Sequence, residues 1–231
     1  MPAPAPGKDG RRASGRWVSE TRDERFTGVR RVSVEIAGGR IEIGSRRGRD
    51  VRVRVTVAVT GWRARIAPRR PPVVPAARLI DGALQLRGRS GQIRVQVDVP
   101  AGLPVEAEVG SGDVTLWGVG GLLRLHVGSG ILAGRELGAG SAEPAETAGT
   151  DVTATNDDGE VNLHFAARPT AVDARSTTGP VLLVLPGGAY RLDTDGADEV
   201  TVTHDAHADS IIRSRSGGRS SVLSATGSEA I

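Results

Sequence analysis

The sequence contains no cysteine. This excludes disulfide-linked scaffolds, thiolate zinc sites, iron–sulfur clusters and cysteine nucleophiles. Aromatic residues are scarce as well, with three tryptophans, one tyrosine and two phenylalanines among 231 residues. No apolar run approaches the roughly 18–20 residues that a membrane-spanning helix needs. The chain therefore offers few rings for stacking against sugars or bases, and no segment that is typical of a membrane span.

Lysine is almost absent, because all of the 30 basic residues except Lys8 are arginine. The formal net charge is +3, and arginines are concentrated between residues 11 and 72. A basic patch of this kind makes a polyanion, either a nucleic acid or an anionic membrane, a candidate partner. The candidate contact residues are Arg46, Arg47, Arg49, Arg52, Arg54, Arg63, Arg65, Arg69 and Arg70.

The N-terminal segment carries charges but is not followed by the apolar stretch of a secretory signal peptide. The chain as written is therefore expected in the cytoplasm. A location at the cell surface is expected if translation starts further upstream or if export takes another route.

Apolar and polar residues alternate in several segments of the chain, as they do in β-strands. Residues 50–59 (DVRVRVTVAV) place valine at every second position, and residues 31–36, 38–43 and 92–99 alternate in the same way. This period of two is typical of β-strands, and no segment longer than a few residues carries the 3.6-residue period of a helix. Residues 1–24, rich in proline, glycine, arginine and serine, are predicted to form a disordered arm.

A repeat dominates the second half. Its unit is a polar turn containing glycine followed by an apolar–x–apolar triplet, as in GSGDVTL (110–116) and DDGEVNL (157–163). The first apolar residues of these triplets, which are predicted to point inward, are Val114, Ile131, Val152, Val161, Val181, Val200 and Val222. Other short strands lie between them and are marked by Leu123, Val172, Leu192 and Ile211. Together these residues recur about every ten residues, which gives a two-strand repeat of about twenty residues.

Each triplet sends two side chains inward and one outward, so a unit buries its apolar face only by stacking on neighbours. The sequence thus predicts an all-β fold, a β-solenoid or β-helix-like stack over residues 105–224. A β-sheet portion over residues 25–104 would join it in a single domain that spans 25–231.

The same units resemble a bacterial putative-adhesin family of unknown function, also described as auto-transporter adhesin head GIN-like, in which S-G-D-V motifs recur about every twenty residues. Residues 111–116 (SGDVTL) match that motif fully, and residues 128–131, 159–161 and 178–181 match it in part. The segment VRRVSVEIAGGRIEI (29–43) resembles the opening strand pair of the family. The resemblance implies a β-helical fold and an adhesin-like surface role, and it supplies no catalytic residues.

Three groups of polar residues are candidates for chemistry. The acidic turn residues Asp113, Asp151, Asp157, Asp158, Glu160, Asp195 and Asp198 could bind calcium, but the calcium-binding G-G-x-G-x-D repeat is missing, so solvated turn carboxylates are expected. The segment 204–209 (HDAHAD) has metal-ligand residue types, yet its spacing suits a helix rather than a loop. Glu106 and Glu108 could serve a glycosidase, but cross-strand ion pairs with Arg52, Arg54 or Arg94 are the simpler expectation.

The sequence therefore favours a non-enzymatic β-repeat scaffold or interaction module, adhesin-like, without a cofactor and with an unknown protein or surface partner. Two alternatives remain. The first is polyanion binding through the N-terminal arginines, and the second is a carbohydrate-active β-helix enzyme.

Overall fold

The computed structural model describes residues 18–59, 73–89, 92–139, 149–195 and 197–225. Within these ranges all regular structure is β-strand, which confirms the predicted all-β class. No helix in these ranges is long and apolar enough to cross a membrane. The strands are β1 (Val18–Phe26), β2 (Arg31–Arg46), β3 (Val51–Val59), β4 (Arg78–Ile80), β5 (Ala83–Gly88), β6 (Gln92–Pro100), β7 (Val105–Trp117), β8 (Leu122–Leu137), β9 (Asp151–Phe165), β10 (Ala171–Ser176), β11 (Val181–Leu185), β12 (Ala189–Asp195), β13 (Glu199–Val200), β14 (Thr203–His204), β15 (Ile211–Ser216) and β16 (Ser220–Ser224).

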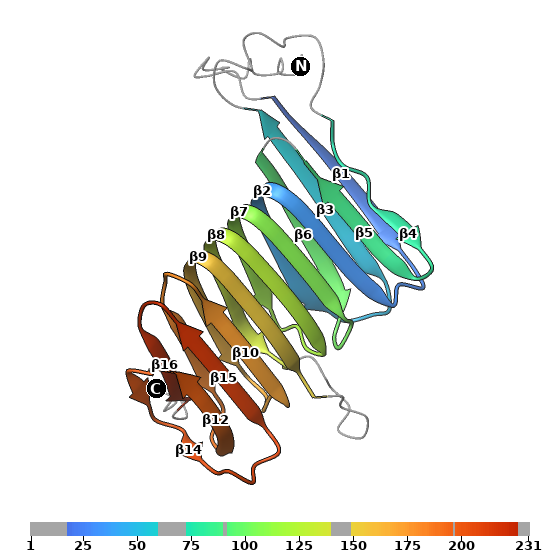
Figure 1. Cartoon of the computed structure of the whole chain (residues 1–231). Coiled ribbons are helices and arrows are strands. Elements are labelled where there is room, and N and C mark those ends of the chain that lie inside the picture. Colours follow the sequence, from blue (N-terminus) through green and yellow to red (C-terminus); the bar gives the residue numbers. More distant parts are fainter. Residues whose placement is uncertain (1–17, 60–72, 90–91, 140–148, 196, 226–231) are drawn as a thin grey trace, which may run out of the picture.

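The strands form one large mixed sheet (Figure 1). Its centre is parallel, because β2, β7, β8 and β9 pair in that order with matching directions. The N-terminal margin is antiparallel, since β3 pairs with β6, β1 pairs with β3, and β4 pairs with β5. Antiparallel strand pairs therefore border the parallel centre of the sheet on its N-terminal side.

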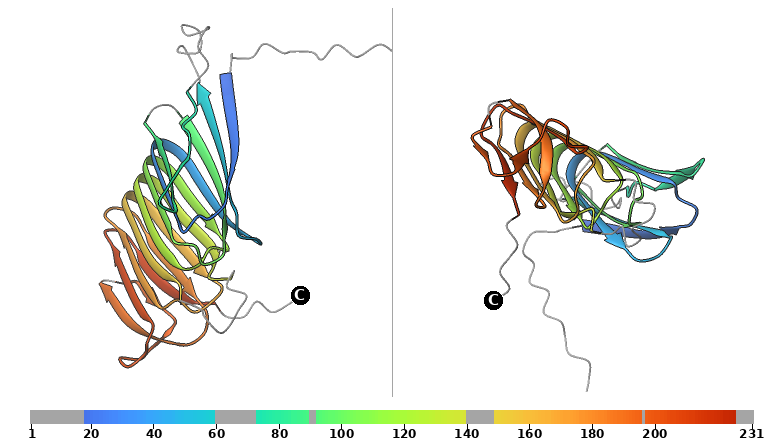
Figure 2. Two further views of the ribbon diagram at one scale, coloured as in Figure 1. Left: turned by 90° about the vertical axis from the view of Figure 1, so that its right-hand side faces the viewer. Right: turned by 90° about the horizontal axis from the view of Figure 1, so that it is seen from below.

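The long strands bend, and their two halves face different neighbours. Residues 31–36 of β2 pair with β5, residues 39–46 pair with β6, and both halves pair with β7. Apolar side chains from both halves, such as Val34 and Ile41, belong to one buried core. The sheet thus folds over itself into two layers around that core, and Figure 2 shows the two layers from below.

Alternation along each strand decides what enters the core. Val114 and Leu116 are fully buried whereas Thr115 between them is exposed, and Val181 and Leu183 are buried in the same pattern. The apolar–x–apolar triplet predicted over residues 110–116 and 177–183 is confirmed in both places. The sequence rule that every second side chain faces inward therefore holds along these strands.

Glycines make the bends possible. Gly112 and Gly130 have φ values of 131° and 130°, in a region that residues with a side chain rarely adopt. A Cβ on Gly112 would lie 1.8 Å from the carbonyl oxygen of Gly39, and a Cβ on Gly130 would lie 2.0 Å from that of Gly112. Both the backbone angle and the close approach of the next strand require glycine at these positions.

The predicted inward face is wrong by one residue at Ile131. Ile131 is 46% exposed, whereas Leu132 is fully buried and lies opposite Val114. Both residues are apolar, so alternation alone does not choose between them; the position of the Gly130 bend does. Val200 also differs, being 42% exposed, because β13 pairs with β16 alone. Ile212 rather than Ile211 is the fully buried residue of β15.

The order of strands in space departs from their order in sequence near both ends. β15 lies between β10 and β12, and β16 lies between β11 and β13. At the other end β2 pairs with β5 and β6, although β3 and β4 lie between β2 and these two strands in the chain. The last two strands are therefore inserted between rows that precede them in sequence.

The arm predicted over residues 1–24 overlaps β1, which begins at Val18. β1 is an antiparallel edge strand on β3, and Thr21 is hydrogen-bonded to Thr56 across that pair at 3.0 Å. β1 has few apolar residues, so its backbone is ordered by pairing with β3. The composition of the segment does not reveal this pairing. Residues 1–17 lie outside the described residues.

Candidate binding face

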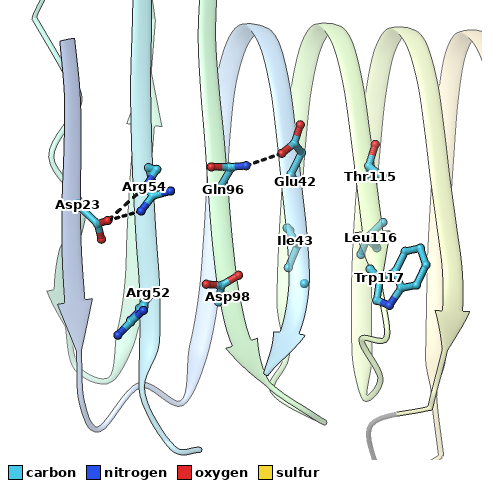
Figure 3. A pocket seen from close by; sticks show the side chains of 11 residues that line it. Asp23, Glu42, Ile43, Arg52, Arg54, Gln96, Asp98, Thr115, Leu116 and Trp117 are labelled. Carbon is cyan, nitrogen blue, oxygen red and sulfur yellow. Dashed lines mark hydrogen bonds and ion pairs between the residues drawn. The ribbon is translucent and has the colours of Figure 1, made fainter. Parts of the chain in front are cut away.

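The groove face is the outer surface formed by β1, β3, β6 and the second halves of β2 and β7. It carries an open groove of about 420 Å³ (Figure 3). The groove exists because these five strands lie side by side in the order β1-β3-β6-β2-β7. Outward side chains from all five strands line it: Asp23, Arg52, Arg54, Gln96, Asp98, Glu42, Thr115 and Trp117. Gly44, which has no side chain, also lines the groove.

Gly44 lies among the residues that line the groove. In the strand register Gly44 is opposite Asp98 on one side and Trp117 on the other. With strands about 4.8 Å apart, the missing side chain leaves a gap of about two strand spacings between Asp98 and Trp117. Figure 3 shows Asp98 and Trp117 at the same level along their strands. Trp117 is 52% exposed, so much of its indole ring is open to solvent.

The backbone does not require glycine at position 44. Its φ lies outside the positive region, and an added Cβ would meet only Asp98 Oδ1, at 3.8 Å. In this it differs from Gly112, where a Cβ overlaps the next strand. The hollow over Gly44 is thus a consequence of residue choice and not of strand geometry.

Two carboxylates of the groove are held by cationic or amide donors. Arg54 Nη2 and Nε donate to Asp23 Oδ2 at 2.8 and 3.2 Å, and this hydrogen bond and charge raise the pKa of Arg54. Gln96 Nε2 donates to Glu42 Oε2 at 2.8 Å, and Arg94 Nη2 lies 3.2 Å from Glu42 Oε1. These contacts fix Asp23 and Glu42 as oriented acceptors at the groove wall.

Arg52 and Asp98 lie opposite each other on β3 and β6 without a direct ion pair among the described residues. Beyond Trp117, the register continues to Arg135 on β8. Arg135 lies close enough to His164 to lower its pKa, after the larger effect of burial. Arg135 therefore adjoins Trp117 on one side, whereas Gly44 leaves the other side open.

The arginines predicted from the sequence divide into three groups. Arg52 and Arg54 line the groove. Arg46 lies at the end of β2, and Arg47 and Arg49 lie in the turn between β2 and β3. Among the described residues none of Arg46, Arg47, Arg49 and Arg52 has an ion-pair partner. The remaining four, Arg63, Arg65, Arg69 and Arg70, lie outside the described residues.

Other sequence expectations find different partners. Glu106 pairs with Arg124 at 3.5 Å in the other layer, and not with Arg52, Arg54 or Arg94. Asp113 accepts a hydrogen bond from Arg40 at 2.7 Å, and Asp158 accepts one from Thr178 at 2.7 Å. In the described ranges, no group of three His, Cys, Asp or Glu residues is placed to hold a metal ion.

The segment 204–209 is part of a local backbone network. His204 Nδ1 accepts the backbone N–H of Leu192 at 3.2 Å, and Asp205 Oδ1 accepts the backbone N–H of His207 at 2.9 Å. Such bonds are typical of loop residues that stabilise turns.

Sequence reasoning missed Trp117, Gly44 and Asp98 as a group. The signal for an exposed indole was present, because alternation in VTLW (114–117) places Thr115 and Trp117 on the outer side of Leu116. The neighbours of Trp117 could not be predicted in this way, because residues 23, 44, 52 and 98 meet only through the spatial order of the strands.

Comparison with known proteins finds likeness in structure and none in sequence. No protein-family model and no curated protein matches the chain. A structure described as a putative cell adhesion protein from Clostridium sporogenes ATCC 15579 covers 89% of this chain and 98% of its own, with 9% identity and a TM-score of 0.42. A putative adhesin from Bacteroides fragilis NCTC 9343 covers 89% and 96%, with 10% identity and a TM-score of 0.38.

A third similar structure, described as a putative lipid binding protein from Parabacteroides distasonis ATCC 8503, covers 90% of this chain and 98% of its own at 9% identity and a TM-score of 0.28. The chain is thus structurally similar to putative adhesins over most of its length, as the S-G-D-V repeat indicates. At these TM-scores the likenesses assign no partner and no activity to this chain, so both depend on its own residues.

Proposed function

We propose that the chain is a β-solenoid of two-strand coils and serves as a non-enzymatic, adhesin-like interaction module that binds its partner through the groove face. The observation that carries this proposal is the in-register pairing of β2, β7 and β8 on both sides of their glycine bends. Each bent strand then corresponds to one coil, and neighbouring coils present their outward side chains in straight rows. Such a scaffold offers an extended, preformed surface to a partner.

The chemistry of the groove supports binding over catalysis. Asp23 and Glu42 are each engaged by an arginine, and Gln96 also donates to Glu42. Groups fixed in this way suit hydrogen bonding to a ligand, and we therefore assign no catalytic step.

Adhesion is tested with beads that carry the full chain. We expect these beads to be retained on intact bacterial or host cells, and retention to fall when Thr115→Arg fills the groove face. Thr153→Arg, the same substitution at an exposed threonine of β9 in the other layer, is the matched control and should leave retention unchanged. Absence of retention by the unsubstituted chain, or equal retention by the Thr115→Arg variant, would overturn the proposal.

The cellular location is a separate measurement. Fractionation combined with protease treatment of intact cells of the native bacterium is expected to show exposure at the surface. Strict retention in the cytoplasm would remove adhesion as the role.

Polyanion binding is the second candidate. It is favoured by Arg46, Arg47, Arg49 and Arg52, which cluster around the β2–β3 turn without ion-pair partners among the described residues. If it operates, affinity for single-stranded DNA or for vesicles with anionic lipid should fall steeply as salt is added, because bound counterions are released. Affinity that does not depend on salt would exclude this candidate.

A further inference from the structure

We propose that the groove face is a carbohydrate-binding site, in which one neutral sugar ring of a polysaccharide stacks on Trp117 and the next ring lies in the hollow over Gly44. This inference rests on the proposed binding role of the groove face and names its ligand class.

Trp117 supplies the stacking surface. An indole that is 52% exposed on a sheet surface costs free energy, because its apolar ring contacts water. The ring is large, flat and rigid, with few rotamers to lose when it binds. The C–H face of a pyranose is also flat and apolar, so stacking buries both surfaces. Trp117 therefore provides a platform for one ring.

Gly44 supplies the space beside that platform. It leaves a gap between Trp117 and Asp98 that is about two strand spacings wide. Neither the φ of Gly44 nor its neighbours require glycine, since a Cβ would meet only Asp98 Oδ1 at 3.8 Å. An ordinary strand residue would fill the hollow at no cost to the fold. Its absence keeps the outer surface of β2 open beside Trp117, where the next sugar ring can lie.

The polar side chains around the hollow supply hydrogen bonds. A sugar ring carries hydroxyl groups around its edge, each able to donate and accept. Asp98 offers a carboxylate and Arg52 offers guanidinium donors, and neither has an ion-pair partner among the described residues. Gln96 and Glu42 are already fixed to each other at 2.8 Å and present oriented acceptors nearby. These polar side chains on β3, β6 and β2 lie beside the hollow and suit the hydroxyl groups of a sugar ring that occupies it.

The charge of the groove disfavours a nucleic acid in the same place. The groove is lined by three carboxylates, Asp23, Glu42 and Asp98, against two arginines, Arg52 and Arg54. Phosphate oxygens next to these carboxylates would be repelled, whereas neutral hydroxyl groups would not. The groove is open across five strands, so a chain of sugar rings can lie over it.

The experiment uses the full chain and neutral oligosaccharides of glucose, mannose, galactose and N-acetylglucosamine, with heparin oligosaccharide and single-stranded DNA as anionic probes. Binding is followed by calorimetry and by tryptophan fluorescence at two salt concentrations. We expect at least one neutral oligosaccharide to bind with little salt dependence. Trp117→Ala and Gly44→Leu should each weaken that binding by at least about tenfold, and Trp117→Phe should retain part of it.

Two matched controls separate the site from a general effect. Ile131→Ala removes another exposed apolar side chain, and Gly187→Leu adds the same side chain where a Cβ also has open space and φ is not positive. Both should bind within about twofold of the unsubstituted protein. Thermal unfolding of all variants checks that Gly44→Leu and Trp117→Ala remain folded.

The outcomes are distinct. Beads retained on cells without any binding of neutral sugar would overturn the carbohydrate site and leave the adhesin-like role standing. Sugar binding that survives both Trp117→Ala and Gly44→Leu would place the site elsewhere and overturn the inference. Binding of anionic probes alone, lost on adding salt, would assign the face to polyanions instead. Failure of both beads and sugars would overturn the two proposals together.

Discussion

A Cβ atom added to Gly112 would lie 1.8 Å from the carbonyl oxygen of Gly39 on the neighbouring strand. The same contact recurs along the stack, because a Cβ on Gly159 would lie 1.9 Å from the carbonyl oxygen of Gly130. Glycines at the bends thus lie one above another, and each lets the backbone of the next strand approach. The S-G-D-V repeat has a physical origin in this column.

Gly112→Ala is expected to destabilise the protein by at least about 3 kcal/mol, through positive-φ strain together with backbone overlap. Gly44→Ala is the matched substitution without either feature, and it should be neutral or stabilising by about 0.5–1 kcal/mol, since alanine restricts the unfolded chain more than glycine does. Urea unfolding of the two variants provides the comparison. Similar losses in both would contradict the role of the bend glycines.

The direction of side chains within a triplet gives a second prediction. Val181 is 1% exposed, whereas Thr115 occupies the outward position of its own triplet. Val181→Asp buries a charge without a partner and should cost about 3–5 kcal/mol. Thr115→Asp should change the free energy of unfolding by no more than about 0.5 kcal/mol. Equal shifts in thermal midpoint would mean that the assigned facing is wrong.

These two cases also mark what the sequence could reveal about the fold. Alternation within VTLW and PVLL gives the facing of Val114 and Val181, because strand side chains alternate whatever the tertiary structure. Ile131 and Leu132 are both apolar, and only the place of the Gly130 bend assigns Leu132 to the core. Local pattern thus predicts strands and their faces, and it fails where two apolar residues adjoin.

The groove required information that local pattern does not contain. Asp23, Arg52 and Asp98 come from three strands that meet through antiparallel pairing. Gly44 and Trp117 join them through parallel pairing of β2 with β7. Composition correctly indicated few aromatic rings, but one ring in the right place is enough to form a platform.

The pH dependence of stability offers a third prediction, through His164. Burial, and then the charge of Arg135, lower its pKa in the folded protein. The unfolded chain therefore binds this proton more tightly, so its contribution to stability is intact above the unfolded pKa near 6.5 and is lost as pH falls through the lower folded value. His164→Gln should make the loss of stability between pH 7.5 and pH 5 smaller.

The measurement is urea unfolding at those two pH values, with His207→Gln as the control for loss of a histidine from the exposed 204–209 loop. A steeper pH dependence in the His164→Gln protein would show that folding stabilises the charged imidazole, which is the opposite of the effect expected from burial and from Arg135.

The insertion of the last strands gives a fourth prediction. β15 lies between β10 and β12. Arg168 links the residue before β15 to the first residue of β12, because it donates to Ser210 Oγ at 2.8 Å and to the carbonyl oxygen of Ala189. β12 pairs with β15 and with the two-residue β14, so β15 supplies most of its backbone partners. Deletion of residues 210–231 removes β15 and β16 together. Amides of residues 189–204 should then lose their protection from hydrogen exchange.

The central strands should keep theirs, because β2, β7, β8 and β9 pair among themselves and not with the deleted segment. Deletion of residues 226–231 alone is the control, since it leaves β15 and β16 intact. Unchanged protection over residues 189–204 after the longer deletion would mean that β12 can pair directly with β10. These strands would then pair in sequence order, and the position of β15 between β10 and β12 would not be needed to protect residues 189–204.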